Sequence, residues 1–144
     1  MADLYVVGVD GSEGSRRALG FGAERAKLSG ASLLLVHVID WSPYAVLPPQ
    51  DLAERHKQRE AELANARTGI LEPLLEEARA RGVTAEALAQ HGHAADTLAT
   101  LAKERHAQQI FVGRRGTSKV QALLFGSVSG SLVQVAGVPV TVVP

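Results

Sequence analysis

The stretch LYVVGVD, residues 4–10, decides the fold of this chain. A short apolar run that is rich in β-branched side chains and lacks polar alternation is typical of a strand buried on both faces, as in a parallel sheet. Residues 32–39 form a second run of the same kind. Between the two runs, the spacing of apolar residues predicts a helix that begins at Ser12 or Gly14 and ends at Gly30.

The rest of the chain continues this alternation of strands and helices. In order, we expect a proline-containing loop over 40–50, a long helix over 51–81 that Pro73 kinks or divides, a strand over 84–90, a helix over 94–105, a strand over 109–112, a helix over 127–135 and a last strand over 138–143. The order predicts a single α/β domain over residues 1–144. We expect a Rossmann-like, doubly wound parallel sheet of five strands, with helices on both faces and right-handed crossovers.

The composition of the chain narrows its class and its partners. Hydrophobic residues make up 46% of the 144 residues, which is typical of a globular domain with a real core. The 15 basic and 15 acidic residues cancel, so no global field attracts nucleic acid or a membrane, and any anion must be bound locally. The chain has no cysteine, no apolar run long enough to span a bilayer, and a strand-like beginning in place of a signal peptide. These features predict a cytoplasmic protein without disulfides.

The most informative motif is Gly113-Arg114-Arg115-Gly116, followed by Gly126-Ser127. Glycine lets the backbone approach a ligand closely, and the amides at the start of a helix favour anions. Ser127 could cap the helix that follows and donate its hydroxyl to a phosphate oxygen. The connection over 114–126 exceeds the roughly two to six residues usual in α/β proteins, which favours a phosphate-binding loop. The alternative is an ordinary connection in which Ser127 is only a structural cap.

Two further segments end at the same edge of the predicted sheet. Asp10 and residues 38–40 follow buried strands, and in open parallel sheets ligands bind beyond the carboxyl ends of the strands. Asp10 could accept from a ribose hydroxyl or hold Mg²⁺ through water, or it could simply be a turn residue beside Gly11. The strand end at Val38 could read the edge of an adenine base through its backbone, or it could be plain core.

Other chemistries find little support in the sequence. His91 and His93 lack a further ligand at a convincing spacing, so they do not predict a metal site. The chain contains neither G-x-x-x-x-G-K-[ST] nor a G-x-S-x-G nucleophile elbow. Short basic pairs occur without interleaved aromatic residues, which argues against nucleic-acid binding. We assign no catalytic residue.

The sequence resembles the universal stress protein family along its whole length. The resemblance rests on residues 6–12 (VVGVDGS), residues 35–40 (LVHVID), the motif G-x-x-G-x9-G-S from Gly113 to Ser127, and the ending over 138–143. It implies a parallel sheet with strand order 3-2-1-4-5. Because branches of the family that do not bind ATP usually lose these glycines, the resemblance implies the ATP-binding branch.

Site residues carry over from this resemblance by position. Asp10, with Gly11 beside it, would meet the ribose and the Mg²⁺ side of the phosphates, and the Val38 backbone would contact adenine. The residues implied for the ribose and phosphates are Val112, Gly113, Arg115, Gly116, Gly126, Ser127 and Val128. The arginine pair over 114–115 departs from the family pattern, in which a small residue precedes His or Arg. This departure could strengthen phosphate binding or alter the choice of ligand.

The resemblance also implies a homodimer that pairs through the final strand, Val138 to Val143. That strand is apolar and would be an aggregation hazard if left unpaired at an edge, although Pro139 removes one donor. We therefore expect a homodimeric, ATP-binding stress-response protein that acts as a nucleotide-dependent switch or sensor on an unknown protein partner.

Two alternatives to this function remain open from the sequence. One is a nucleotide-independent dimeric scaffold, and the other is an enzyme that slowly hydrolyses ATP or transfers a nucleotidyl group. If the loop holds ATP or a related adenine nucleotide, Gly113→Val or Gly126→Val should abolish binding while the fold survives.

Overall fold

The computed structural model describes residues 3–40, 52–115 and 126–144. Along the chain its elements are β1 (Leu4–Gly8), α1 (Glu13–Ser29), β2 (Ser32–Asp40), α2 (Leu52–Ala66), the π-helical turn η2 (Arg67–Leu71), α3 (Glu72–Ala80), β3 (Ala85–Gly92), α4 (Ala94–Glu104), β4 (Gln109–Gly113), α5 (Ser127–Val135) and β5 (Val140–Val143). Every strand and helix expected from the sequence is present. The loop predicted over 40–50 lies outside the described residues, apart from Asp40.

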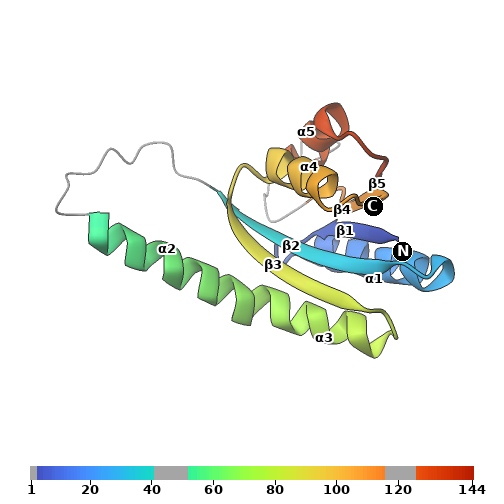
Figure 1. Cartoon of the computed structure of the whole chain (residues 1–144), viewed down its shortest axis with the longest axis horizontal. Coiled ribbons are helices and arrows are strands. Elements are labelled where there is room, and N and C mark those ends of the chain that lie inside the picture. The colour runs from blue at the N-terminus through green and yellow to red at the C-terminus, as the bar shows by residue number, and fades with distance from the viewer. Residues whose placement is uncertain (1–2, 41–51, 116–125) are drawn as a thin grey trace.

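The five strands form one parallel sheet in the order β3-β2-β1-β4-β5, as expected. Strand β1 lies at the centre, between β2 and β4 (Figure 1). Its side chains explain why this run lacks polar alternation. Val6 and Val7 point to opposite faces of the sheet and are both fully buried, each in a different apolar cluster.

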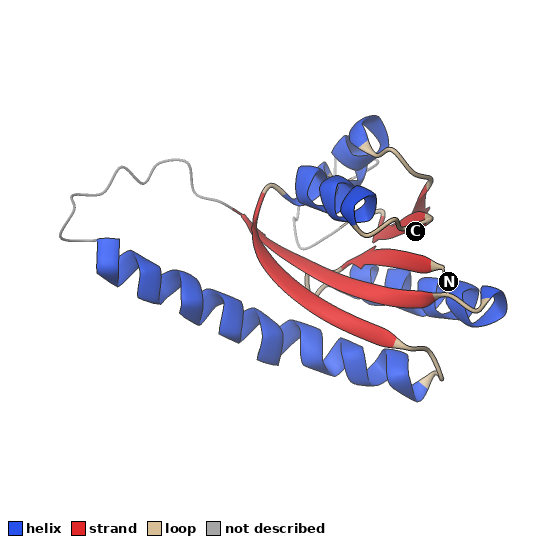
Figure 2. Cartoon of the chain, in the orientation of Figure 1, coloured by secondary structure: helices blue, strands red, loops and turns tan. Residues whose placement is uncertain are grey.

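Helices cover both faces of the sheet (Figure 2). On one face, α1, η2 and α3 bury a cluster that includes Leu19, Leu71 and Leu74. On the other face, α4 and α5 bury a cluster that includes Leu98 and Leu132. Among the described residues, no helix combines the length and the apolarity that crossing a bilayer would require.

Local sequence signals set the ends of the first helix. The Ser12 side chain accepts from the Ser15 amide at the start of α1, and Gly30 ends the helix with φ at 76°. Glycine tolerates that left-handed conformation without strain. The strand predicted over 4–10 stops two residues early, at Gly8, which is the last β1 residue paired with β2; beyond it, among the described residues, only the Val9 amide still donates to β2, to the Val36 carbonyl.

The helix predicted over 51–81 is divided at the expected place. Pro73 has no amide hydrogen, so it cannot donate within a regular helix. One residue earlier, the Glu72 amide donates to the Arg67 carbonyl, five residues back, which makes the turn π-helical. The helical segment therefore continues as α3, but its hydrogen-bond register changes directly before Pro73.

Candidate functional site

A cleft of about 460 Å³ lies where the carboxyl ends of β1, β2 and β4 meet the first turns of α4 and α5. Because β1 pairs with β2 on one side and β4 on the other, this is the point where the strand order reverses. The cleft is lined by these residues that the sequence singled out: Asp10, Val38, Val112, Gly113, Arg115, Gly126, Ser127 and Val128. Three distant segments of the chain thus meet at one place.

Of the predicted residues that the structure describes, Gly11 alone is not part of this lining. Gly116 lies outside the described residues. Gly11 is in the turn between β1 and α1, where its φ of +82° favours glycine, and it does not line the cleft. Its role in the described structure is to reverse the chain. Sequence analysis missed several lining residues, among them Ser15, His37, Ala94, Leu98 and Ser129.

Asp10 is fixed in place by the start of α1. Its Oδ1 accepts from both the amide and the hydroxyl of Ser12, and the Asp10 amide donates to the Ser15 hydroxyl at 3.2 Å. The Ser15 hydroxyl in turn donates to the Ser12 carbonyl at 3.1 Å. This network holds one carboxylate at the edge of the cleft. The short spacing Asp-x-Ser-x-x-Ser could have indicated it in the sequence.

The start of α5 differs from the expectation that Ser127 caps it. Gly126 occupies the cap position with extended backbone, none of the described side chains caps the helix, and Ser127 is its exposed first residue. The serine that secures this end is the buried Ser129, whose hydroxyl donates to the Arg114 carbonyl at 2.9 Å and the Gly126 carbonyl at 3.2 Å. Among the described residues no side chain caps this helix, so none of them supplies a side-chain acceptor to its first-turn amides, which lie at the cleft.

Gly113 has a packing role that sequence analysis did not find. A Cβ at Gly113 would lie 2.7 Å from the Gly14 carbonyl carbon, and a Cβ at Gly14 would lie 2.4 Å from the Arg115 carbonyl oxygen. The backbones of α1 and the end of β4 therefore lie in close contact, and a side chain at either glycine would force main-chain atoms to shift. Gly113→Val should therefore lower the stability of the fold, which the sequence did not predict, because valine would collide with main-chain atoms of Gly14.

The backbone of Val38 faces the cleft. The Leu33 amide donates to the Thr84 carbonyl, so odd-numbered residues of β2 direct their backbone groups toward β3. The Val36 carbonyl accepts from the Val9 amide, so even-numbered residues face β1. The β1–β2 ladder ends with Gly8 opposite Val36, whereas the β2–β3 ladder continues to Asp40. The amide and carbonyl of Val38 consequently point past the end of β1.

The described residues contain no group of three or more acidic or histidine side chains that could hold a metal ion. Of the two histidines considered for a metal, His91 instead pairs with Glu62 of α2 at 3.0 Å. Mg²⁺ commonly binds through one or two carboxylates together with the phosphates of a substrate. The chemistry of the cleft fits that mode, with Asp10 as the carboxylate, and not a cage made by protein alone.

Comparison with known proteins decides the family. The profile of the universal stress protein family matches residues 1–144. The chain belongs to this family. The universal stress protein YxiE of Bacillus subtilis is 31% identical over 150 residues that cover 99% of each chain. A universal stress protein of Mycobacterium tuberculosis is also 31% identical, over 96% of this chain and 47% of its own length, so our chain spans about half of that longer relative.

Solved structures of universal stress proteins share this fold. The UspA protein of Lactobacillus plantarum matches 99% of this chain and 97% of its own with a TM-score of 0.83, at 21% identity. A universal stress protein in complex with cAMP matches 99% of this chain and 96% of its own with a TM-score of 0.72, at 26% identity. These neighbours have the same overall architecture as the five-stranded universal stress protein described above.

Proposed function

We propose that this universal stress protein binds an adenine nucleotide, ATP with Mg²⁺, in the cleft and acts as a nucleotide-dependent switch. The observation that carries the proposal is the meeting, at one cleft, of a backbone edge at Val38 with Arg115 and with the start of α5, which no described side chain caps. The backbone edge at Val38 suits a base, whereas the helix start and Arg115 suit phosphates. The family relative in complex with cAMP supports an adenine-containing ligand.

The base would be recognised through the main chain of Val38. Adenine presents an acceptor at N1 and a donor at its 6-amino group. An amide and a carbonyl that point the same way can satisfy both of these groups. Guanine presents a donor at N1 and an acceptor at O6, so the same backbone groups would oppose it. Leu98, which is buried and lines the cleft, would give the ring an apolar wall.

The phosphates would lie at the start of α5. Amides at a helix start carry partial positive charge, and Ser127 adds an exposed hydroxyl there. Arg115, which is also exposed and lines the cleft, supplies a full charge. Mg²⁺ would enter with the phosphates and meet Asp10, in the mode that the carboxylate chemistry fits.

We also propose that two copies associate through β5. This strand is last in the sheet order and pairs with β4 alone among the described strands. Exposed apolar side chains lie on the helix before it, where Val133 is 56% and Val135 is 50% exposed. Pairing with a second copy would satisfy the open edge and cover part of this surface.

A ligand titration tests the nucleotide site. A ligand that binds only the native state must raise its melting temperature, so ATP with Mg²⁺ should raise Tm and GTP should do so much less. The same samples, measured by light scattering with and without ATP, report the mass of the assembly. The nucleotide site would be contradicted if titration calorimetry detected no heat of binding and thermal unfolding showed no Tm shift at millimolar ATP.

The packing of Gly113 favours a second candidate function. Because that glycine is needed where α1 touches β4, its presence does not by itself imply a phosphate ligand. A nucleotide-independent dimeric scaffold would keep the same glycine for structural reasons. Such a protein would be a dimer by light scattering and would show no response to ATP, which is the pattern that separates the two candidates.

A further inference from the structure

We propose that His37 is a positioning residue that keeps the amide of Val38 available to the N1 atom of the bound base. The inference rests on the adenine site proposed above. It concerns a side chain that the resemblance to known proteins did not select. The key contact is between the imidazole Nδ1 of His37 and the carbonyl oxygen of Val9, at 2.7 Å.

The hydrogen bond determines which role the Nδ1 atom of the imidazole plays. A carbonyl oxygen can only accept, so Nδ1 of His37 must carry the hydrogen and donate it. The partner, Val9, is the first residue after β1, and its own amide donates to the Val36 carbonyl at 2.9 Å. The side chain of His37 therefore reaches the carbonyl that the backbone of β2 would use next.

The register shows what the histidine replaces. In a parallel ladder each inward-facing residue of β2 accepts from one residue of the neighbour and donates to the residue two positions earlier. After the bond from Val9 to Val36, the next bond would run from the Val38 amide to the Val9 carbonyl. The ladder instead ends with Gly8 opposite Val36. His37 donates a hydrogen bond to the Val9 carbonyl in place of the Val38 amide. The Val38 amide therefore stays on the open side of β2, which lines the cleft.

This arrangement prevents the sheet from closing over the site. Without a donor at position 37, the buried Val9 carbonyl would lack a partner, and the Val38 amide is the nearest group that could satisfy it. That bond would extend the β1–β2 ladder by one step. It would also withdraw the donor that N1 of adenine needs, while the carbonyl of Val38 would remain in place. His37 thus couples strand pairing to recognition of the base.

The first test needs no ligand. His37→Phe keeps a ring of similar size but removes the donor, whereas His37→Asn keeps a donor near the position of Nδ1. In the free protein, hydrogen exchange of the Val38 amide should be at least about tenfold slower in His37→Phe than in the wild type, because the amide becomes paired. His37→Asn should resemble the wild type. Equal exchange in all three proteins would overturn the role of His37, whether or not nucleotide binds.

The second test uses ATP and 1-deaza-ATP, in which the N1 acceptor is replaced by a C–H group. The wild type should bind ATP about five- to tenfold more tightly than the analogue, which is the worth of one hydrogen bond. The ratio should fall toward one in His37→Phe and return in His37→Asn. A loss of stability alone would weaken both ligands equally and leave this ratio unchanged.

The outcomes separate the two proposals. If the wild type binds neither ligand, the proposed function fails, and the exchange measurement still decides whether His37 holds the ladder open. If the wild type binds ATP but the ratio is the same in His37→Phe, nucleotide binding stands and the role of His37 is overturned. A ratio that collapses in His37→Phe and recovers in His37→Asn supports it.

Discussion

The two ends of the sheet are built from the same strands but are closed differently. At the amino end, main-chain groups of neighbouring segments satisfy each other. The Ser32 amide donates to the Asp3 carbonyl at 2.8 Å, and the Leu4 carbonyl accepts from the Gln108 amide at 2.9 Å. At the carboxyl end, β2 continues to Asp40 although β1 has ended, and two helices begin at the opening.

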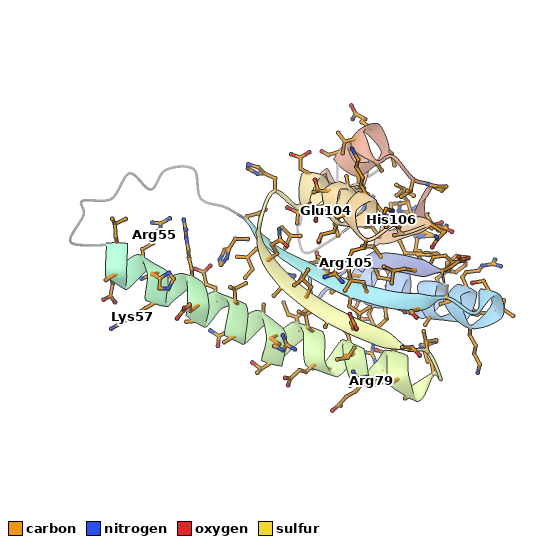
Figure 3. The ribbon with its side chains drawn as sticks, viewed as in Figure 1. Arg55, Lys57, Arg79, Glu104, Arg105 and His106 are labelled. Carbon is orange, nitrogen blue, oxygen red and sulfur yellow. The ribbon has the colours of Figure 1, made fainter. Side chains whose placement is uncertain are left out.

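Both ends of the sheet carry charged side chains, so the ends differ mainly in where the strand ladders stop. The groove at the amino end measures about 230 Å³ and is lined by Arg105 together with the acidic Asp3 and Glu86. Figure 3 shows Arg105 near the end of α4, and it shows Arg55 and Lys57 projecting from α2. None of these cations lines the carboxyl-end cleft, where Arg115 is the one lysine or arginine among the described lining residues.

The largest expected effect is on the junction of α1 with β4. Gly14→Ala should lower the free energy of unfolding by about 3 kcal/mol, because the new Cβ would lie 2.4 Å from a main-chain oxygen. The matched control at the amino end is Gly30→Ala, where φ is +76° and no atom lies within 4 Å. That change should cost only about 1 kcal/mol. Urea denaturation measures both, and equal losses would show that the junction is not tight.

Introducing a negative charge at the start of α5 should weaken nucleotide binding without lowering the stability of the fold. Ser127→Asp would place a carboxylate where the phosphates are proposed to lie, and like charges about 4 Å apart near a protein surface repel by roughly 4 kcal/mol. We expect ATP affinity to fall about 100-fold, while an acidic residue at a helix start raises stability by about 0.5 kcal/mol. The control is Ser131→Asp, which is exposed further along α5. Calorimetry that finds the two variants equal in affinity would refute the phosphate position.

Neutralising a cation should lower the affinity for ATP only at the carboxyl end of the sheet. Arg115→Gln should weaken ATP about tenfold or more, because a charge-assisted hydrogen bond contributes about 1.5–3 kcal/mol. Arg105→Gln, at the amino end, should leave the affinity unchanged. Titrations at low and high salt should show a smaller salt dependence for Arg115→Gln than for the wild type. An equal loss in both variants would point to a general field effect and not to a contact.

The smallest expected effect is on the loop closure at Ser129. Ser129→Ala removes a buried hydroxyl that donates to the Arg114 and Gly126 carbonyls, and it should lower stability by about 1 kcal/mol. Ser131→Ala, on the exposed side of α5, should change stability by less than about 0.5 kcal/mol. Thermal unfolding of the two variants side by side measures the difference. If Ser129→Ala left the stability unchanged, the hydrogen bonds of the Ser129 hydroxyl would contribute nothing to it.

Much of the fold could be predicted because its signals are local. The β-branched run over 4–10 indicated a strand buried on both faces, Gly30 indicated a helix end, and Pro73 indicated the division between α2 and α3. The strand order came from the family resemblance, and the structure confirms it. The π-helical form of the turn before Pro73 was not predictable, because it depends on how two helical registers meet.

The candidate site could be predicted only in part, because its geometry depends on contacts between distant segments. The sequence indicated which strand ends would meet, and Asp10, Val38 and Gly113 do line one cleft. It could not show that Gly113 touches Gly14, or that Ser129 and not Ser127 secures the start of α5. Each of these facts is a contact across more than ten residues, for which a single sequence contains no local signal.

The central place of β1 has a consequence for synthesis on the ribosome. Its first residue, Leu4, meets Gln108, the residue just before β4, and 104 residues separate them along the chain. At about 5–20 residues per second, β1 waits roughly 5–20 s for this neighbour. During that interval, one edge of this apolar strand lacks its partner β4. Nascent chains that end before β4 should therefore aggregate, and a chaperone that shields β1 should raise the yield of the complete protein.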